Sequence, residues 1–221
     1  MTVRATARSM PPLFNETAGT PDFTEPTSAL WTRNRPLRRL VERAELADPS
    51  LSLHSRNVAR LTLEIGKALY LPQRQLTMLV FAAAVHDIGK LSVPSRVLAK
   101  PGPLEPWERL AVQRHPSEGQ RLLQAHVESP QLLAIVRSHH ERWDGNGYPD
   151  GLVAERIPLG ARIVAVADAF PAMVEPRPYR DRLSSHLARK ELLEQAGKQF
   201  DPLCARAGFS VTGALVPAVD V

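Results

Sequence analysis

The sequence predicts an all-α protein, and three observations support this expectation. From about Ser50 onward, apolar residues recur at the three- and four-residue spacing that places them on one side of a helix. Few stretches show the alternation of apolar and polar residues that is typical of strands. Five of the predicted helices also carry a histidine or an aspartate on their apolar side. With 221 residues, the chain is long enough for one core with extensions at its ends.

Composition and charge restrict the classes of partner. The longest apolar run, from Met78 to Val85, is too short to span a bilayer, and the N-terminus has no apolar signal core, so we expect no membrane association. The one cysteine, Cys204, suits a reducing compartment, and we expect a cytoplasmic protein. A net charge of +5 suits an anionic ligand such as a nucleotide. The arginine-rich residues 33–43 lack aromatic residues and a recognition motif, so they predict a solvated helix face and no nucleic-acid binding.

The N-terminal part of the chain precedes the predicted bundle. Residues 1 to about 27 mix proline, threonine, glycine and glutamate without hydrophobic periodicity, and we expect them to be flexible. From Pro36 to Ala47 the pattern predicts a helix, which ends near Asp48-Pro49.

The first two helices of the predicted bundle carry the first polar residues of interest. In the helix after Leu51, extending the apolar stripe by one turn towards the N-terminus reaches His54. That stripe consists of Val58, Leu61, Ile65 and Leu69. The next helix, Gln75 to about Ile88, is nearly all apolar and is therefore expected to be central, and it ends with His86-Asp87.

The third helix begins near Pro106. Its apolar side is formed by Trp107, Leu110 and Ala111, and continuing the spacing places His115 on that side. A lone histidine on an apolar face is more often a satisfied core residue than a ligand. Neither His54 nor His115 therefore indicates a site by itself.

The fourth and fifth helices complete the set. The apolar face of residues 132–136 continues into His139 and His140, and the helix over residues 158–173 carries Asp168 on its apolar face. Adjacent buried polar residues are harder to satisfy by chance than single ones, so these positions are more specific.

These polar residues predict a metal site. The set comprises His54, His86, Asp87, His115, His139, His140 and Asp168. Burying such groups without partners costs several kcal/mol, and a common metal centre would compensate all of them. Five imidazoles and two carboxylates are too many ligands for one tetrahedral ion, and they suit two octahedral ions, iron or manganese, bridged by Asp87. His126 and His186 belong to no motif, and we expect them to be structural or exposed.

The runs that contain these residues resemble the HD-GYP family of bacterial signalling phosphodiesterases, a branch of the HD phosphohydrolases. The most specific run is His139-His140-Glu141-Arg142-Trp143-Asp144-Gly145-Asn146-Gly147-Tyr148-Pro149. The others include His86-Asp87-Ile88-Gly89-Lys90, Lys100-Pro101-Gly102, His115-Pro116 and Arg177-Pro178-Tyr179-Arg180. The resemblance implies an HD-domain helical bundle around a metal site, here a dinuclear one.

The resemblance also implies an activity and roles for single residues. Members of the family linearise cyclic di-GMP to pGpG, and some continue to GMP. The seven residues above would be the metal ligands, with Asp87 also counted as catalytic. Lys90 would bind the scissile phosphate, and because it follows His86 by four residues we expect both on one helix face. Tyr148, Arg177 and Arg180 would contact the dinucleotide, through stacking on a base and pairing with phosphates.

The sequence departs from the family pattern at two places, and each departure leads to a further prediction. Ser50 stands where some members have a glutamate that holds a third metal, so we expect two ions and pGpG as the product. Pro171 stands where aspartate is usual, and Val174 and Pro176 also differ from the pattern. Since proline removes a helical hydrogen bond, we expect the fifth helix to kink or end near Phe170 and substrate affinity to be affected.

The resemblance divides the chain into three parts. These are a flexible N-terminal segment with a short helix over residues 1–49, an HD-GYP phosphodiesterase domain over 50–208, and a C-terminal tail over 209–221. No sensor domain is recognisable, which leaves regulation by a sensor or signalling partner, and a homodimer stays open. Two alternatives also stay open: a metal-dependent phosphohydrolase of another nucleotide, and a non-catalytic receptor or interaction module for cyclic di-GMP.

Overall fold

The structure is a computed structural model that describes residues 34–47, 49–175 and 182–215. The elements are α2 (Arg35–Ala47), α3 (Pro49–Ala68), α4 (Gln73–Val85), the 3-10 helix η1 (Ile88–Ser92), α5 (Ser95–Leu98), α6 (Pro106–Gln113), α7 (His115–Leu123), α8 (Pro130–Ser138), the 3-10 helix η2 (Ala154–Arg156), α9 (Leu159–Val174), α10 (Ser185–Glu194) and α11 (Pro202–Leu215). Within these residues the regular structure is helical apart from two isolated bridges, which confirms the predicted all-α fold.

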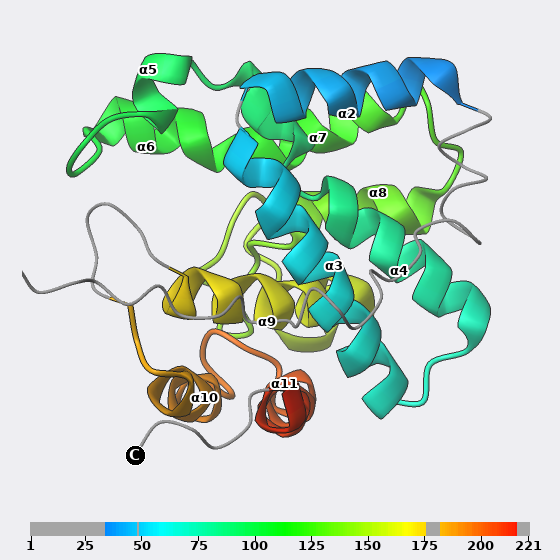
Figure 1. Cartoon of the computed structure of the whole chain (residues 1–221), viewed down its shortest axis with the longest axis vertical. Helices are drawn as coiled ribbons and strands as arrows, with labels where there is room; N and C mark the ends of the chain where they lie inside the picture. Colours follow the sequence, from blue (N-terminus) through cyan, green and yellow to red (C-terminus); the bar gives the residue numbers. More distant parts are fainter. Residues whose placement is uncertain (1–33, 48, 176–181, 216–221) are drawn as a thin grey trace, which may run out of the picture.

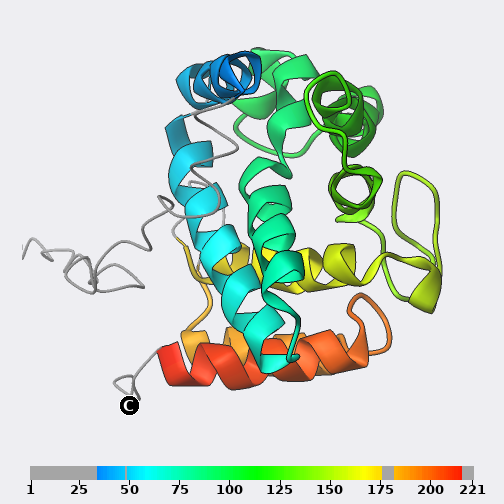
Figure 2. The ribbon, with the colours of Figure 1, turned by 90° about the vertical axis from the view of Figure 1, so that its right-hand side faces the viewer.

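The helices pack around α3, α4 and α9. Figure 1 shows α3 and α4 side by side, with α9 crossing them, α10 and α11 beyond α9, and α2 and α5–α7 at the opposite end. The view in Figure 2 keeps this order, with α10 and α11 lying along one end of the bundle. α4 and α9 are rich in buried apolar residues because each has neighbours on several sides.

The central helix α4 is shorter than the sequence predicts. It ends at Val85, so His86 and Asp87 lie in the turn between α4 and η1, and Lys90 belongs to η1. The expectation that His86 and Lys90 share one helix face is therefore wrong. The tighter winding of η1 instead turns the Lys90 side chain back onto Asp87, three residues earlier.

The prediction that Trp107 and Leu110 form a buried face of the third helix is also wrong. Trp107 and Leu110 on α6 are 53% and 58% exposed, whereas His115 is 1% exposed. α6 ends at Gln113, and Pro116 lies in the first turn of a new helix, α7, where its missing N–H costs nothing. His115 is buried because α7 packs closely against η1, and the stripe on α6 has no part in it.

The fifth helix does not end near Phe170. α9 continues through Pro171 to Val174, and the backbone N–H of Glu175 still donates to the carbonyl of Pro171 at 2.9 Å. The proline side chain is buried, so its packing offsets the lost backbone hydrogen bond. As a result, α9 carries its last turn and Glu175 past Asp168 towards α3.

We predict that Gly89→Ala lowers the free energy of unfolding by about 2 kcal/mol or more, because a Cβ there would overlap the carbonyl of His115 and lie 2.5 Å from the backbone nitrogen of Gly119. Urea denaturation of metal-free protein measures the loss. Gly213→Ala is the control, since its Cβ would meet the movable guanidinium of Arg189. Equal stability of the two variants would contradict the close approach of η1 and α7.

Candidate metal centre

The seven predicted ligands come from five parts of the bundle and meet in one place. His54 lies on α3, the His86-Asp87 pair follows α4, His115 begins α7, the pair His139-His140 follows α8, and Asp168 lies on α9. Ring centroids of neighbouring histidines are 4.2–5.6 Å apart along the chain of contacts from His54 through His86 and His139 to His140. The structure therefore brings together every one of these seven side chains.

The ligand atoms form two groups that share one carboxylate. Among the described residues, Asp87, His115, His139 and His140 form one group that could hold a metal ion. The second such group consists of His54, His86 and Asp87. Within each group the candidate ligand atoms lie within 4.8 Å of one another.

The two oxygens of Asp87 face different groups. Oδ1 lies 3.2 Å from Nε2 of His115, and Oδ2 lies 3.4 Å from Nε2 of His86. Asp168 adds to the second group, because its Oδ1 is 2.9 Å from Nε2 of His54 and 3.8 Å from Nε2 of His86. This arrangement fits a bridging carboxylate between two cations.

Helix ends fix the orientation of three of the histidines. Nδ1 of His86, His115 and His139 lies 2.7, 2.8 and 2.7 Å from the carbonyl oxygen three residues earlier. Carbonyls in the last turn of a helix have no intrahelical partner, so they are available as acceptors. A carbonyl only accepts, so each ring donates through Nδ1 and turns the lone pair of Nε2 towards the cluster.

Unsatisfied buried atoms indicate that the side chains of the cluster fit a bound cation. Nε2 of His86 and Oδ1 of Asp87 are buried without a hydrogen-bond partner. Nε2 of His115 and Nε2 of His139 lie 3.2 Å apart, although both rings already donate through Nδ1. Two lone pairs repel at this distance, so the donor set fits a metal ion between them. Among the described residues, the ligand atoms of this cluster could hold a metal ion.

Burial and mutual charge shift the pKa values of the cluster. Burial lowers the pKa of His140 to about 4, and burial with the neighbouring imidazoles holds the pKa of His139 well below its usual value. Burial opposes the charged form of His54 as well, but the carboxylates of Asp168, 2.9 Å from Nε2, and Glu175, 3.8 Å from Nδ1, outweigh it and raise the pKa to about 9. Burial would raise the pKa of Asp87, yet Lys90 and the imidazoles hold it well below its usual value. At neutral pH the cluster thus has a charged Asp87, neutral His139 and His140, and a protonated His54.

Lys90 and Tyr148 lie at the edge of the cluster. Nζ of Lys90 is 2.6 Å from Oδ2 of Asp87, and the side chain is partly exposed. The Tyr148 ring lies against His140, with centroids 5.0 Å apart and planes tilted by 35°. Both predicted substrate contacts therefore border the candidate metal ligands. Arg177 and Arg180 fall outside the described residues.

The loop that carries Tyr148 is anchored by a residue that sequence reasoning missed. Glu141 is buried, and its carboxylate accepts from the backbone N–H groups of Asp150 at 2.7 Å and Leu152 at 3.1 Å. Gly147 passes so close to the backbone of Glu141 and Arg142 that a Cβ would overlap them. The sequence did contain one indication of this role. Glu141 directly follows two clustered histidines, and a glutamate buried beside them needs hydrogen-bond donors.

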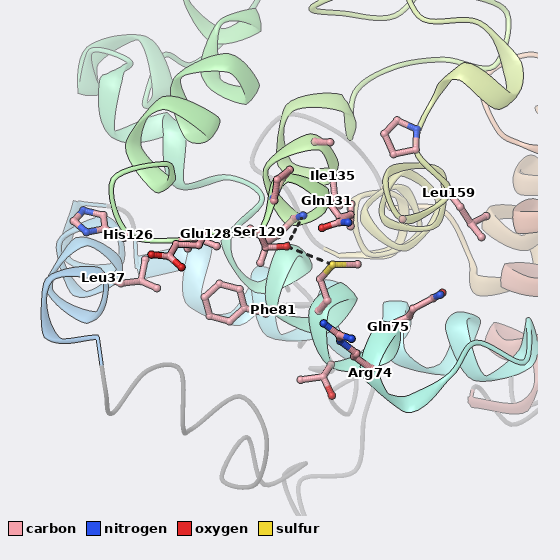
Figure 3. Close-up of a pocket in the computed structure, with 18 of the residues that line it drawn as sticks. Leu37, Arg74, Gln75, Phe81, His126, Glu128, Ser129, Gln131, Ile135 and Leu159 are labelled. Carbon is pink, nitrogen blue, oxygen red and sulfur yellow. Dashed lines mark hydrogen bonds between the residues drawn. The ribbon is translucent and has the colours of Figure 1, made fainter.

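A separate pocket of about 1330 Å³ lies between α2, α4, α8 and the start of α9. Figure 3 shows its mainly apolar walls, including Leu37, Phe81 and Ile135, with Ser129 hydrogen-bonded to the sulfur of Met78. His126 lines this pocket, whereas none of the seven cluster residues does. His186 is exposed on α10. The two histidines left out of the predicted site thus lie away from the cluster.

In the part of the chain that the structure describes, no helix has the length and apolar character needed to cross a membrane.

Known structures share this fold. A cyclic GMP-AMP-specific phosphodiesterase of Vibrio cholerae (V-cGAP3) aligns with a TM-score of 0.57 at 19% identity, covering 75% of this chain and 46% of that one. Bd1817, an HDG"Y"P protein from Bdellovibrio bacteriovorus, aligns with a TM-score of 0.60 at 18% identity over 84% of this chain and 63% of that one. The HD domain of phosphodiesterase PgpH from Listeria monocytogenes, in complex with cyclic-di-AMP, aligns with a TM-score of 0.57 at 18% identity over 80% and 94%.

Curated relatives match at higher identity. The cyclic di-GMP phosphodiesterase response regulator RpfG of Xanthomonas campestris is 39% identical over 175 residues, which cover 77% of this chain and 46% of the relative. A cyclic di-GMP phosphodiesterase of Thermotoga maritima is 40% identical over 162 residues, covering 72% and 44%. The chain therefore spans about half the length of these relatives. The family model of the HD domain matches residues 39–203, and the chain belongs to the HD domain family, as its resemblance to HD-GYP proteins predicted.

Proposed function

We propose that this chain is a metal-dependent phosphodiesterase that hydrolyses cyclic di-GMP to linear pGpG. The proposal rests mainly on the position of Asp87, whose two carboxylate oxygens face two separate groups of histidines. Tyr148 and Lys90 lie beside this carboxylate and its histidines, where a phosphodiester would be bound. Relatives at 36–40% identity are named cyclic di-GMP phosphodiesterases, which supports the choice of substrate.

The proposed centre holds two divalent ions, iron or manganese. His54, His86, Asp87 and Asp168 would hold one ion, and Asp87, His115, His139 and His140 the other, because these sets follow the two groups of ligand atoms. Imidazole and carboxylate ligands with open positions suit these metals. Bound ions supply Lewis acidity and lower the pKa of coordinated water, so hydrolysis at neutral pH needs no side-chain base.

The remaining polar residues bind and orient the substrate. The Lys90 ammonium would face a phosphoryl oxygen and stabilise the charge that grows there during in-line displacement. The Tyr148 ring offers a surface on which a guanine can stack, and Arg177 and Arg180 would pair with phosphates. We take residues 50–208 as the phosphodiesterase domain, with the segments over 1–49 and 209–221 flanking it.

A second substrate is favoured by particular relatives. A 3'3'-cGAMP-specific phosphodiesterase of Vibrio cholerae is 41% identical over 131 residues, covering 59% of this chain and 30% of the relative. The two dinucleotides differ in one purine, so Tyr148 could stack on either. Competition between equal concentrations of both substrates decides which has the higher kcat/KM.

Incubation of manganese-loaded protein with cyclic di-GMP, without oxygen, should yield pGpG on chromatography. Asp87→Ala should abolish turnover and retain less metal than the wild type, because it removes a ligand from both groups. His139→Ala should also lose activity, whereas the matched control His186→Ala, an exposed histidine outside the cluster, should not. Full turnover by Asp87→Ala would refute the proposed centre. Wild-type protein that binds metal and cyclic di-GMP without cleaving it would favour the receptor alternative.

Lys90→Met should lower kcat by about 10²–10³ and leave the metal content unchanged, because the lysine stabilises charge on the phosphate and is not a ligand. Lys67→Met, at an exposed lysine on α3, is the control. Steady-state kinetics and elemental analysis of the same preparations measure both quantities. An unchanged kcat would remove Lys90 from the mechanism.

The affinity for Mn²⁺ should rise by about tenfold per pH unit for each proton released between pH 6.5 and 8. The affinity should rise with pH because of His54. Its pKa is raised to about 9, so metal-free protein carries a proton there that metal binding must displace. His139 and His140 have lowered pKa values and are already neutral in this range. Titrations at several pH values measure the slope, and a flat affinity would contradict the displacement.

A further inference from the structure

His54 is oriented differently from the three histidines that use helix-end carbonyls. His86, His115 and His139 lie at helix boundaries, where the carbonyl three residues earlier is available to Nδ1. His54 is the sixth residue of α3, so carbonyls in the preceding turn are engaged in the helix itself. Its Nδ1 therefore needs a partner from another part of the chain if the ring is to be fixed.

Glu175 is placed to supply that partner. It directly follows α9, and its Oε2 lies 3.8 Å from Nδ1 of His54. On the other side of the ring, Nε2 of His54 lies 2.9 Å from Asp168, two helical turns before Glu175. The His54 ring thus lies between two carboxylates, Asp168 from within α9 and Glu175 directly after it. Both His54 and Glu175 are largely buried, at 14% and 23% side-chain exposure, so solvent screens this contact only partly.

Asn57 fixes the carboxylate in turn. Its Nδ2 donates to Oε1 of Glu175 at 2.8 Å, and it lies on α3 three residues after His54, on the same side of the helix. One oxygen of Glu175 is therefore occupied by Asn57, while the other faces His54. A carboxylate beside Nδ1 favours the tautomer that has its proton there and leaves the lone pair on Nε2.

We infer that Glu175 is a positioning residue of the metal centre: with Asn57 it orients His54 and sets its tautomer, so that Nε2 faces the ion. This inference rests on the proposed function only in that the cluster binds metal. Glu175 belongs to the segment from Pro171 to Pro176 that departs from the family pattern, and its placement depends on α9 continuing through Pro171. Asp168 lies near the Nε2 atoms of His54 and His86, at 2.9 and 3.8 Å, whereas Glu175 faces Nδ1 on the other side of the His54 ring, which separates this role from direct ligation.

Titration of the chelator-stripped full chain with Mn²⁺, followed by the EPR signal of the free ion, tests the inference. Glu175→Ala should weaken binding by about ten- to a hundredfold without changing the number of ions bound. Glu175→Gln should restore part of the affinity, because its amide oxygen can still accept from Asn57, which keeps a side chain of the same shape beside His54, and Asn57→Ala should cause a smaller loss. Glu64→Ala, at a more exposed carboxylate on α3, should bind as the wild type does.

Two further readouts separate positioning from a structural effect. The melting temperature of metal-free Glu175→Ala should match that of the wild type. Imidazole ¹⁵N NMR of the Zn²⁺-loaded wild type should show His54 protonated at Nδ1 and liganded through Nε2, with this signature lost or mixed in Glu175→Ala. Wild-type affinity in Glu175→Ala would overturn the inference, and so would the loss of one bound ion, which would make Glu175 a ligand.

The outcomes for this inference and for the proposed function are distinguishable. Metal affinity is measured without substrate, so wild-type protein that binds Mn²⁺ but leaves cyclic di-GMP intact would contradict only the proposed function. Glu175→Ala that binds Mn²⁺ normally, in a chain that cleaves cyclic di-GMP, would contradict only the inference.

Discussion

The burial of Asp87 among imidazoles is the constraint on which the rest of the structure depends. A charged carboxylate that is 4% exposed needs compensation, and the bundle supplies it by directing histidines from several helices to one point. The close approach of η1 to α7 brings His115 to one oxygen of Asp87, while the end of α4 brings His86 to the other. Glycine at position 89 makes that approach possible, because a Cβ there would overlap the backbone of α7. The same helix contacts that form the fold therefore also assemble the site.

Helix boundaries fix the orientation of most of the histidine rings in the site. His86, His115 and His139 follow or begin helices, where the carbonyls of the last helical turn are available to orient their rings. His54 lies within a helix and takes its orientation from side chains of α9 and its C-terminal residue. The loop after His140 is ordered in a similar manner, by the buried carboxylate of Glu141. Four of the five clustered histidines thus have a supporting group, which comes from the local backbone for His86, His115 and His139 and from packed carboxylates for His54.

Much of this arrangement could be predicted from the sequence, because five predicted helices each carried a polar residue on an apolar face. No single one of these residues indicated a site, but together with the family resemblance they identified all seven members of the cluster. Periodicity failed for the helix before His115, since Trp107 and Leu110 suggested an apolar face but are exposed on α6. It also failed for α9, because a buried proline can be accommodated when its ring packs well. The role of Glu175 depends on contacts with α3 that form only when α3 and α9 pack, so periodicity along the chain does not predict it. Glu141 bonds within its own loop, where the sequence has no helical periodicity to interpret.

The central claim is that two ions share Asp87. Anomalous diffraction from crystals of the manganese-loaded protein, recorded on both sides of the manganese edge, tests it directly. Two peaks about 3.5–4 Å apart are expected, one on each side of the Asp87 carboxylate. One of them should lie towards His54, His86 and Asp168, and the other towards His115, His139 and His140. A single peak, or two peaks of which only one contacts Asp87, would contradict it.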